Sequence, residues 1–177
     1  MNIKGNSVIL REMEAKDQVM LESLIHDPEI VKITGGYLRS AFCRMQVSGC
    51  CRPSDTTGGL RRVIADQEHP ETGLGIIMLS HMDPEKKTAE IYIKLAGSAR
   101  GRGYGRDAVD TLVSYAFREL GLHEICSSIL EHNTASRRLF EACGFQLKSM
   151  HRSRADREGH CRNVYLYCIK NHSADDI

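Results

Sequence analysis

A short glycine-rich turn between a strand-forming and a helix-forming segment constrains the fold of this chain more than any other feature of its sequence. Residues 88–95 alternate apolar with polar side chains and are rich in β-branched and aromatic types, which is typical of a strand. From residue 106 to 120, apolar side chains recur at steps of three and four, which predicts a helix that ends at Gly121. Together with a β-rich segment at 124–130, this order predicts one strand–helix–strand unit.

The turn has the features of an anion site. Its sequence is Arg100-Gly101-Arg102-Gly103-Tyr104-Gly105-Arg106. Glycine permits positive φ angles and lets a ligand approach the backbone closely. The first amides of the following helix have no helical partners and lie at the positive end of the helix dipole, which suits a pyrophosphate. Taken alone, the turn is equally consistent with a flexible corner whose arginines lie in solvent.

Two nucleotide-binding motifs can be compared with this turn. A P-loop needs a Gly-Lys-Ser/Thr end, and the lysine is missing here. The dinucleotide motif G-x-G-x-x-G matches at Gly101 and Gly103 but places Arg106 where the third glycine belongs. Glu131, after the next strand, imitates the ribose-binding acid of that motif. A dinucleotide-binding enzyme therefore stays an alternative.

The rest of the chain reads as a mixed α+β domain. Further strands are predicted at 7–11, 61–66, 75–80, 145–151 and 162–169, the last two joined by a turn at 156–159. One helix is predicted to begin at Asp17 and end at Asp27-Pro28, and another to span Asn133–Cys143. Glycine and proline break the pattern between 30 and 60, where we expect only a short helix near 41–47. Most neighbouring strands should be antiparallel, in a single domain over residues 1–177.

Composition excludes several classes of partner. The formal net charge is +1, so no overall field favours nucleic acid or a membrane surface. No apolar run approaches the about 20 residues of a membrane helix, and the first residues do not resemble a secretory signal. The seven cysteines are odd in number and contain no C-x-x-C pair, which indicates reduced thiols and a cytoplasmic protein. The spacing of histidine and cysteine predicts no metal site.

At this point the sequence resembles the GNAT acetyltransferase superfamily, and within it the RimJ/RimL-like branch. The turn matches the family's [Q/R]-x-x-G-x-[G/A] motif at Arg100, Gly103 and Gly105. The segment 133–145, NTASRRLFEACGF, is similar to the family's second motif. The opening of the chain and its C-terminal hairpin are similar to the RimJ/RimL pattern, whereas residues 34–60 match poorly.

The resemblance implies a central, mostly antiparallel and splayed sheet flanked by helices, with acetyl-CoA as co-substrate. Backbone groups of the strand before the turn would pair with pantetheine and hold the oxyanion. Asn133 would cap its helix and touch pantetheine. Arg137 could reach the 3′-phosphate, although a long arginine on a helix is often simply solvated. The cofactor-binding residues expected on this basis are Ile93, Leu95, Arg100, Gly101, Arg102, Gly103, Tyr104, Gly105, Arg106, Asn133, Arg137 and Phe140.

The resemblance also suggests the catalytic groups. The attacking amine must lose a proton, and Glu90, on the same strand face as Tyr92, is the candidate base. Glu90 could instead be a solvated residue or a partner of Lys94. Phe140 stands where the family often has a tyrosine that acts as the general acid. Ser136, one turn earlier, or a bound water therefore becomes the candidate proton donor.

The acceptor is the least determined part. The resemblance implies a primary amine, either a protein N-terminus or a small molecule, with contacts expected from residues 26–60. The absence of the family tyrosine leaves a non-catalytic acyl-CoA-binding module as a further alternative. The C-terminal hairpin is compatible with a homodimer.

Overall fold

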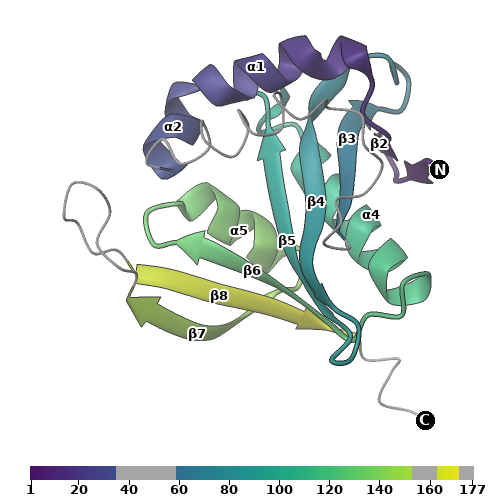
Figure 1. Ribbon diagram of the computed structural model, residues 1–177. Helices are drawn as coiled ribbons and strands as arrows, with labels where there is room; N and C mark the ends of the chain where they lie inside the picture. The colour runs from purple at the N-terminus through teal and green to yellow at the C-terminus, as the bar shows by residue number, and fades with distance from the viewer. Residues whose placement is uncertain (35–58, 153–162, 172–177) are drawn as a thin grey trace.

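One sheet organises the described part of the chain. The computed structural model describes residues 1–34, 59–152 and 163–171. Within these residues, eight strands pair in the order β1-β2-β3-β4-β5-β6-β8-β7 (Figure 1). The strands are β1 (Ile3–Lys4), β2 (Val8–Arg11), β3 (Leu60–Asp66), β4 (Gly73–Asp83), β5 (Thr88–Leu95), β6 (Glu124–Leu130), β7 (Gln146–Arg152) and β8 (Asn163–Lys170). The short helix expected near 41–47 and the turn at 156–159 lie outside the described residues.

The predicted mixed, mostly antiparallel sheet is confirmed. Every pair of neighbouring strands is antiparallel except β5 and β6, which run parallel. A parallel pair needs a crossover, and helix α4 (Tyr104–Arg118) supplies it. The other helices are α1 (Gln18–His26), α2 (Pro28–Thr34) and α5 (Thr134–Ala142). No helix in the described ranges is long and apolar enough to cross a membrane.

Successive side chains of β4 pack against different helices, which shows the face of the sheet that each helix covers. Ile77 is buried in the core cluster that contains the apolar face of α4 and Phe140 of α5. Its neighbour Ile76 belongs to a second cluster, formed with buried residues of α1 and α2. Because successive strand side chains point to opposite faces, α4 and α5 cover one face and α1 and α2 the other. Figure 1 shows α1 and α2 together across one end of the sheet.

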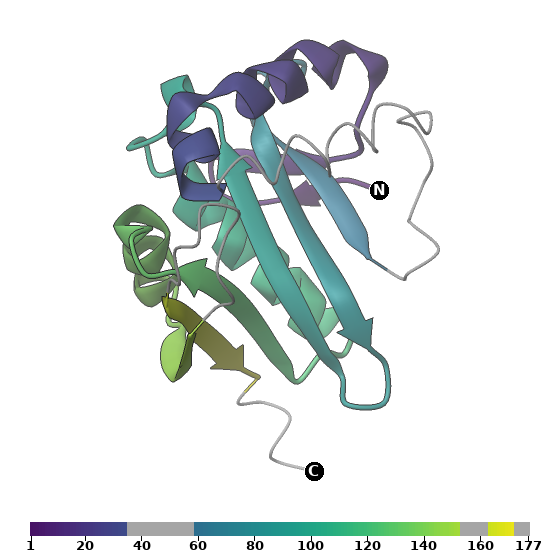
Figure 2. The same cartoon turned by 60° about the vertical axis from the view of Figure 1, so that its left-hand side comes forward.

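The parallel strands β5 and β6 stay together only at one end. Their pairing covers Thr88–Glu90 against Glu124–Cys126. Beyond Cys126, β6 continues to pair with β8 as far as Leu130, while β5 continues along β4 to Leu95. Figure 2 shows the two strands diverging. The splay expected between these strands is therefore present, and it opens the sheet on the side of the glycine turn.

Helix α2 and strand β4 differ from the sequence prediction. The first helix does end at Asp27-Pro28, but α2 begins at once, with Pro28 in the first helical position where its missing N–H matters least. Asp27 Oδ1 accepts hydrogen bonds from the amides of Glu29 and Ile30, at 2.9 and 3.2 Å, and so caps the new helix. The sequence pattern did not predict this short helix, because glycine and proline break the pattern soon after it. β4 also runs to Asp83, past the predicted end at Ser80.

The expectation of seven reduced thiols is wrong for two cysteines. Cys126 of β6 and Cys168 of β8 are bonded through their sulfur atoms. They lie directly opposite one another in the antiparallel ladder, with Cα atoms 4.1 Å apart. This proximity depends on strand register, which the spacing of cysteines in a sequence does not reveal. Cys143 is free.

A buried ion pair fixes the start of α1 against the sheet. The guanidinium of Arg11 donates two hydrogen bonds to Asp17, from Nη1 to Oδ2 at 2.8 Å and from Nη2 to Oδ1 at 2.7 Å. Both residues are buried, 4% and 2% exposed. Burial by itself raises the pKa of Asp17, but the hydrogen bonds from Arg11 and from the Glu14 amide outweigh it and lower the pKa overall. The native state therefore favours the carboxylate.

We expect Asp17→Asn to lower the free energy of unfolding by about 3 kcal/mol at pH 7, because it leaves the Arg11 charge buried without its partner. Since the pKa of Asp17 is lowered on folding, the stabilisation is present above the unfolded pKa and is lost as pH falls. Urea unfolding should show the gap between wild type and variant shrinking below about pH 4. The exposed Glu22→Gln on α1 is the control and should change stability by less than about 0.5 kcal/mol. An equal effect of both substitutions would contradict the role of the pair.

Candidate functional site

A cleft of about 390 Å³ lies where β5 and β6 separate. One wall comes from α2, a second from the end of β5 and the glycine turn, and a third from α5. Because α2 and α5 cover opposite faces of the sheet, the cleft passes through the opening between the strands. Its lining residues are Glu29, Ile30, Ile33, Ile93, Lys94, Leu95, Arg100, Gly101, Gly103, Gly105, Arg106, Asn133, Ala135, Ser136 and Leu139.

The glycine turn forms one end of this cleft. Gly101 and Gly103 have φ angles of +70° and +84°, a region that strongly favours glycine. Gly103 is the N-cap of α4, and its carbonyl accepts the first hydrogen bond of that helix, from the Asp107 amide. The amides between these residues have no partner within the helix. At Gly105, an added Cβ would lie 3.1 Å from Leu95 Cδ1, so a larger residue there would have to displace the Leu95 side chain.

Arg100 lines the cleft, but its guanidinium binds other parts of the protein. Nε and Nη2 donate to the carbonyl of Leu95, at 3.1 and 3.0 Å. Nη2 also donates to Asp27 at 2.7 Å, and Nη1 donates to Glu29. These contacts join the glycine turn to the junction of α1 and α2. The most direct role of Arg100 in the structure is therefore to hold α2 beside the turn.

Four predicted cofactor-binding residues do not line the cleft. Tyr104 is 8% exposed and donates its hydroxyl proton to Asp66 of β3. Arg102 stacks over the Tyr104 ring, with Cζ 5.2 Å from its centroid. Phe140 is buried and packs edge-on against Phe145.

The fourth, Arg137, lies over the ring of Tyr165 and donates from Nε to the hydroxyl of Tyr167 at 3.3 Å. These contacts anchor it to β8. The rotation of α5 about its axis points Arg137 toward β8 and its neighbour Ser136 toward the cleft.

Helix α5 does bring two predicted residues into the cleft. Asn133 caps the helix, since its Oδ1 accepts a hydrogen bond from the Ser136 amide at 3.1 Å. The predicted cap is confirmed. Asn133 and Ser136 both line the cleft, on the wall that faces the end of β5.

Glu90 lies at the vertex of the splay, outside the lining of the cleft, as the last residue of β5 that pairs with β6. Its Oε1 accepts a hydrogen bond from Ser128 Oγ of β6 at 2.6 Å, and its Oε2 accepts one from the Tyr92 hydroxyl at 2.6 Å. Nδ1 of His81, from β4, is 3.0 Å from Oε2. The carboxylate is thus held by side chains from three strands, and its side chain is 23% exposed.

Burial shifts the pKa of two neighbours of Glu90 on this strand face. The pKa of Tyr92 is raised, first by burial and then by the hydrogen bond and charge of Glu90. Tyr92 therefore keeps its proton at neutral pH and acts as a donor. Burial lowers the pKa of Lys94 to about 8. Lys94 lines the cleft, so part of its population is neutral in mildly alkaline solution.

Some features of the lining were not predicted from the sequence. Glu29, Ile30 and Ile33 lie in the stretch 26–60 that was expected to contact the acceptor, but helix α2, which carries them, was not predicted. The Lys94 side chain was expected only as a possible partner of Glu90. The contact of His81 with Glu90 depends on an irregularity in β4 that no sequence pattern marked.

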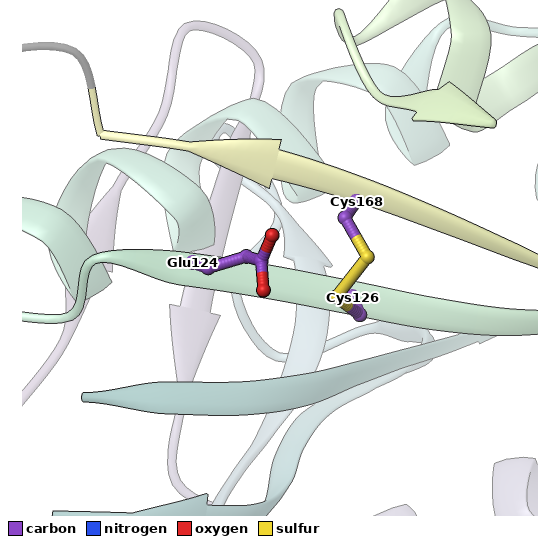
Figure 3. Close-up of side chains that lie close together, drawn as sticks. All are labelled: Glu124, Cys126 and Cys168. Atoms are coloured by element: carbon purple, nitrogen blue, oxygen red, sulfur yellow. A yellow bond between two sulfur atoms is a disulfide. The ribbon is translucent and has the colours of Figure 1, made fainter. Parts of the chain in front are cut away.

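Glu124, Cys126 and Cys168 are the described side chains whose potential ligand atoms lie close enough together for a metal ion, within 4.8 Å of one another (Figure 3). The two sulfur atoms are bonded to each other. Both oxygens of Glu124 accept hydrogen bonds from Lys148 Nζ at 2.9 Å. All three potential ligands already have partners, so this group joins β6 to β8 and β7.

The comparisons with known proteins agree with this geometry. The family model of the acetyltransferase (GNAT) domain matches residues 7–146. The uncharacterized N-acetyltransferase p20 of Bacillus licheniformis is 25% identical over 162 residues, 90% of this chain and 90% of that protein. The spermidine N(1)-acetyltransferase of Vibrio cholerae is 29% identical over 72 residues, 41% of this chain and 42% of that protein.

Among solved structures, the spermidine N-acetyltransferase from Vibrio cholerae in complex with CoA and spermine matches with a TM-score of 0.73 and 20% identity, over 93% of this chain and 95% of the other. At this identity the likeness shows a shared fold.

The geometry of the turn predicts the effect of a single methyl group. Gly103→Ala should raise the Kd for acetyl-CoA at least tenfold, about 1.4 kcal/mol, because it adds a methyl group to a left-handed residue that lines the cleft. Gly121→Ala is the matched control, since Gly121 also has a positive φ (+64°) and open space around it but does not line the cleft. Both variants should lose about 1 kcal/mol of stability. Equal acetyl-CoA affinity in calorimetry would show that the turn does not hold the cofactor.

Proposed function

Because the chain belongs to the acetyltransferase (GNAT) family, we propose that it moves the acetyl group of acetyl-CoA to a primary amine by direct attack of the amine on the thioester. The observation that carries the proposal is the cleft through the splayed sheet, with the glycine turn at its end and the Glu90 carboxylate at the vertex of the opening. CoA needs a site for its pyrophosphate and, beside it, a strand edge along which pantetheine can lie. The glycine turn and the edge of β5 next to the opening would provide these two sites.

The backbone accounts for most of the proposed cofactor contacts. The pyrophosphate would bind the amides at the start of α4, with Arg106 beside them. Pantetheine would lie along the edge of β5 from Ile93 to Leu95 that does not pair with β6, opposite Asn133 of α5. Arg100 would contribute by holding the turn and α2 together. Arg102, Tyr104, Arg137 and Phe140 would act through packing, because their side chains bind elsewhere in the protein.

The reaction needs a neutral amine and a place for the charge that develops. Glu90 would accept the ammonium proton, directly or through one water, and release the lone pair for attack. A backbone amide at the edge of β5 that does not pair with β6 would then stabilise the oxyanion of the tetrahedral intermediate. Collapse of this intermediate breaks the C–S bond and leaves CoA as a thiolate, which needs only a mild acid.

We propose a small-molecule amine as the acceptor, with a protein N-terminus as the alternative. Support comes from the spermidine N(1)-acetyltransferase relative and from the related fold determined with CoA and spermine. Turnover of acetyl-CoA against a panel of polyamines, small monoamines and N-terminal peptides tests this choice. Exclusive turnover of peptides would favour the alternative. The RimJ/RimL-like branch, a homodimer and a cytoplasmic location stay predictions.

A non-catalytic acyl-CoA-binding module is the second candidate, because Phe140 is buried in the core and cannot donate a proton. Tight binding of acetyl-CoA without turnover of any amine would support it. Binding of NAD in preference to acetyl-CoA would instead favour the dinucleotide alternative.

Substitution of Glu90 tests the base. Glu90→Gln should lower kcat about 100-fold at pH 7, because general base catalysis typically contributes at least that factor. The loss should shrink toward pH 10, where the free amine deprotonates itself. Glu119→Gln, an exposed carboxylate at the far end of α4, is the control and should leave the pH–rate profile unchanged. A parallel pH profile for Glu90→Gln and wild type would reject Glu90 as the base.

Substitution of Ser136 tests the proton donor. If its hydroxyl protonates the leaving thiolate, Ser136→Ala should lower kcat about tenfold while the Kd for acetyl-CoA changes less than twofold. Thr134→Ala, in the first turn of α5 and outside the cleft lining, serves as the control. Unchanged kcat for Ser136→Ala would assign the proton to a bound water.

A further inference from the structure

The strand that leads to His81 is irregular where it passes Glu90. The pairing of β4 with β5 is regular up to Ser80 opposite Glu90, and it resumes at Asp83 opposite Thr88. The residues between them form a β-bulge. Bulges change the direction in which side chains point and are common next to functional sites. His81 has a φ angle of +48°, which is costly for a residue with a Cβ. Such strain persists where surrounding contacts maintain it.

The bulge directs the imidazole at the carboxylate. His81 Nδ1 lies 3.0 Å from Glu90 Oε2 and 3.2 Å from Ser80 Oγ. The His81 side chain is 77% exposed, whereas that of Glu90 is 23% exposed. The imidazole therefore joins the half-buried carboxylate to solvent.

We propose that His81 relays to solvent the proton that Glu90 takes from the acceptor amine. This inference rests on the proposed function of Glu90. The amine nitrogen loses its proton to the carboxylate, and the resulting carboxylic acid transfers it to the lone pair on Nδ1. The imidazolium then releases a proton from Nε2 to water. Exchange with water moves the remaining proton from Nδ1 back to Nε2, so that Glu90 and His81 both regain their starting forms before the next turnover. No oxidant or further reactant is needed.

The other groups that contact Glu90 cannot act as the proton relay. Tyr92 and Ser128 both donate to the carboxylate, and a hydroxyl does not hold an extra proton as a stable cation near neutral pH. An imidazole does, and it exchanges protons quickly at that pH. Within the described ranges, Glu90 is the charged group in contact with His81, and Ser80 is its polar neighbour on β4.

Chemical rescue provides the test. His81→Gly tolerates the positive φ angle, removes the imidazole and leaves space for a small base. In a weakly buffering solution at pH 7, its kcat should fall roughly tenfold, with the KM for the acceptor little changed. Added imidazole should restore kcat in proportion to its concentration and leave the wild type unaffected. His81→Asn, which also tolerates this backbone region, should be slow without being rescued.

Two controls separate the possible failures. Lys87→Gly relieves the second positive φ angle that the described part of the chain has at a residue with a side chain, +55°, without removing an imidazole, and should keep wild-type kcat. If Glu90→Gln behaves as expected of the base but His81→Gly keeps full activity, or loses activity without rescue by imidazole, the relay is wrong and the proposed function stands. If the wild type acetylates no amine, or Glu90→Gln is fully active, the proposed role of Glu90 fails and the relay fails with it.

Discussion

The separation of β5 from β6 is the constraint on which the rest of the structure depends. Their parallel pairing covers only Thr88–Glu90 against Glu124–Cys126, so beyond that point the two strands no longer pair with each other and an opening lies between them. The crossover through α4 makes the parallel pair possible, and β8 keeps the far half of β6 paired. The opening admits a ligand to the centre of the sheet, and the start of α4 brings its amides to the same place. A fully paired sheet would close this route.

Arg100 and Arg102 of the turn hold neighbouring parts of the protein together. Arg100 connects the Leu95 carbonyl with Asp27 and Glu29, and in doing so places α2 over the opening. Arg102 covers the ring of Tyr104, whose hydroxyl is bound to Asp66. The proposed anion site therefore depends chiefly on backbone amides, oriented by glycines at positive φ. Such a site keeps its geometry before the ligand arrives, which limits the ordering cost of binding.

Glu90 shows how a carboxylate can be held in place without a buried countercharge. Ser128 and Tyr92 donate to separate oxygens, and the bulge in β4 adds the imidazole of His81. These partners come from three different strands, so the position of the carboxylate is a property of the sheet. Cys126, opposite Glu90 in the parallel pair, is bonded to Cys168 and ties this part of β6 to β8.

The sequence by itself determined the regular elements and the glycine turn between β5 and α4. Strong local patterns predicted β5, α4, β6 and α5, with the cap at Asn133 and the glycine turn, because periodicity and capping act over a few neighbouring residues. The tertiary structure alone decided which side chains meet. Sequence distance does not show that Arg100 reaches across to α2, that Arg137 turns toward β8 while Ser136 faces the cleft, or that Cys126 lies opposite Cys168. These contacts follow from strand register and helix rotation, which are set by packing between segments far apart in the chain.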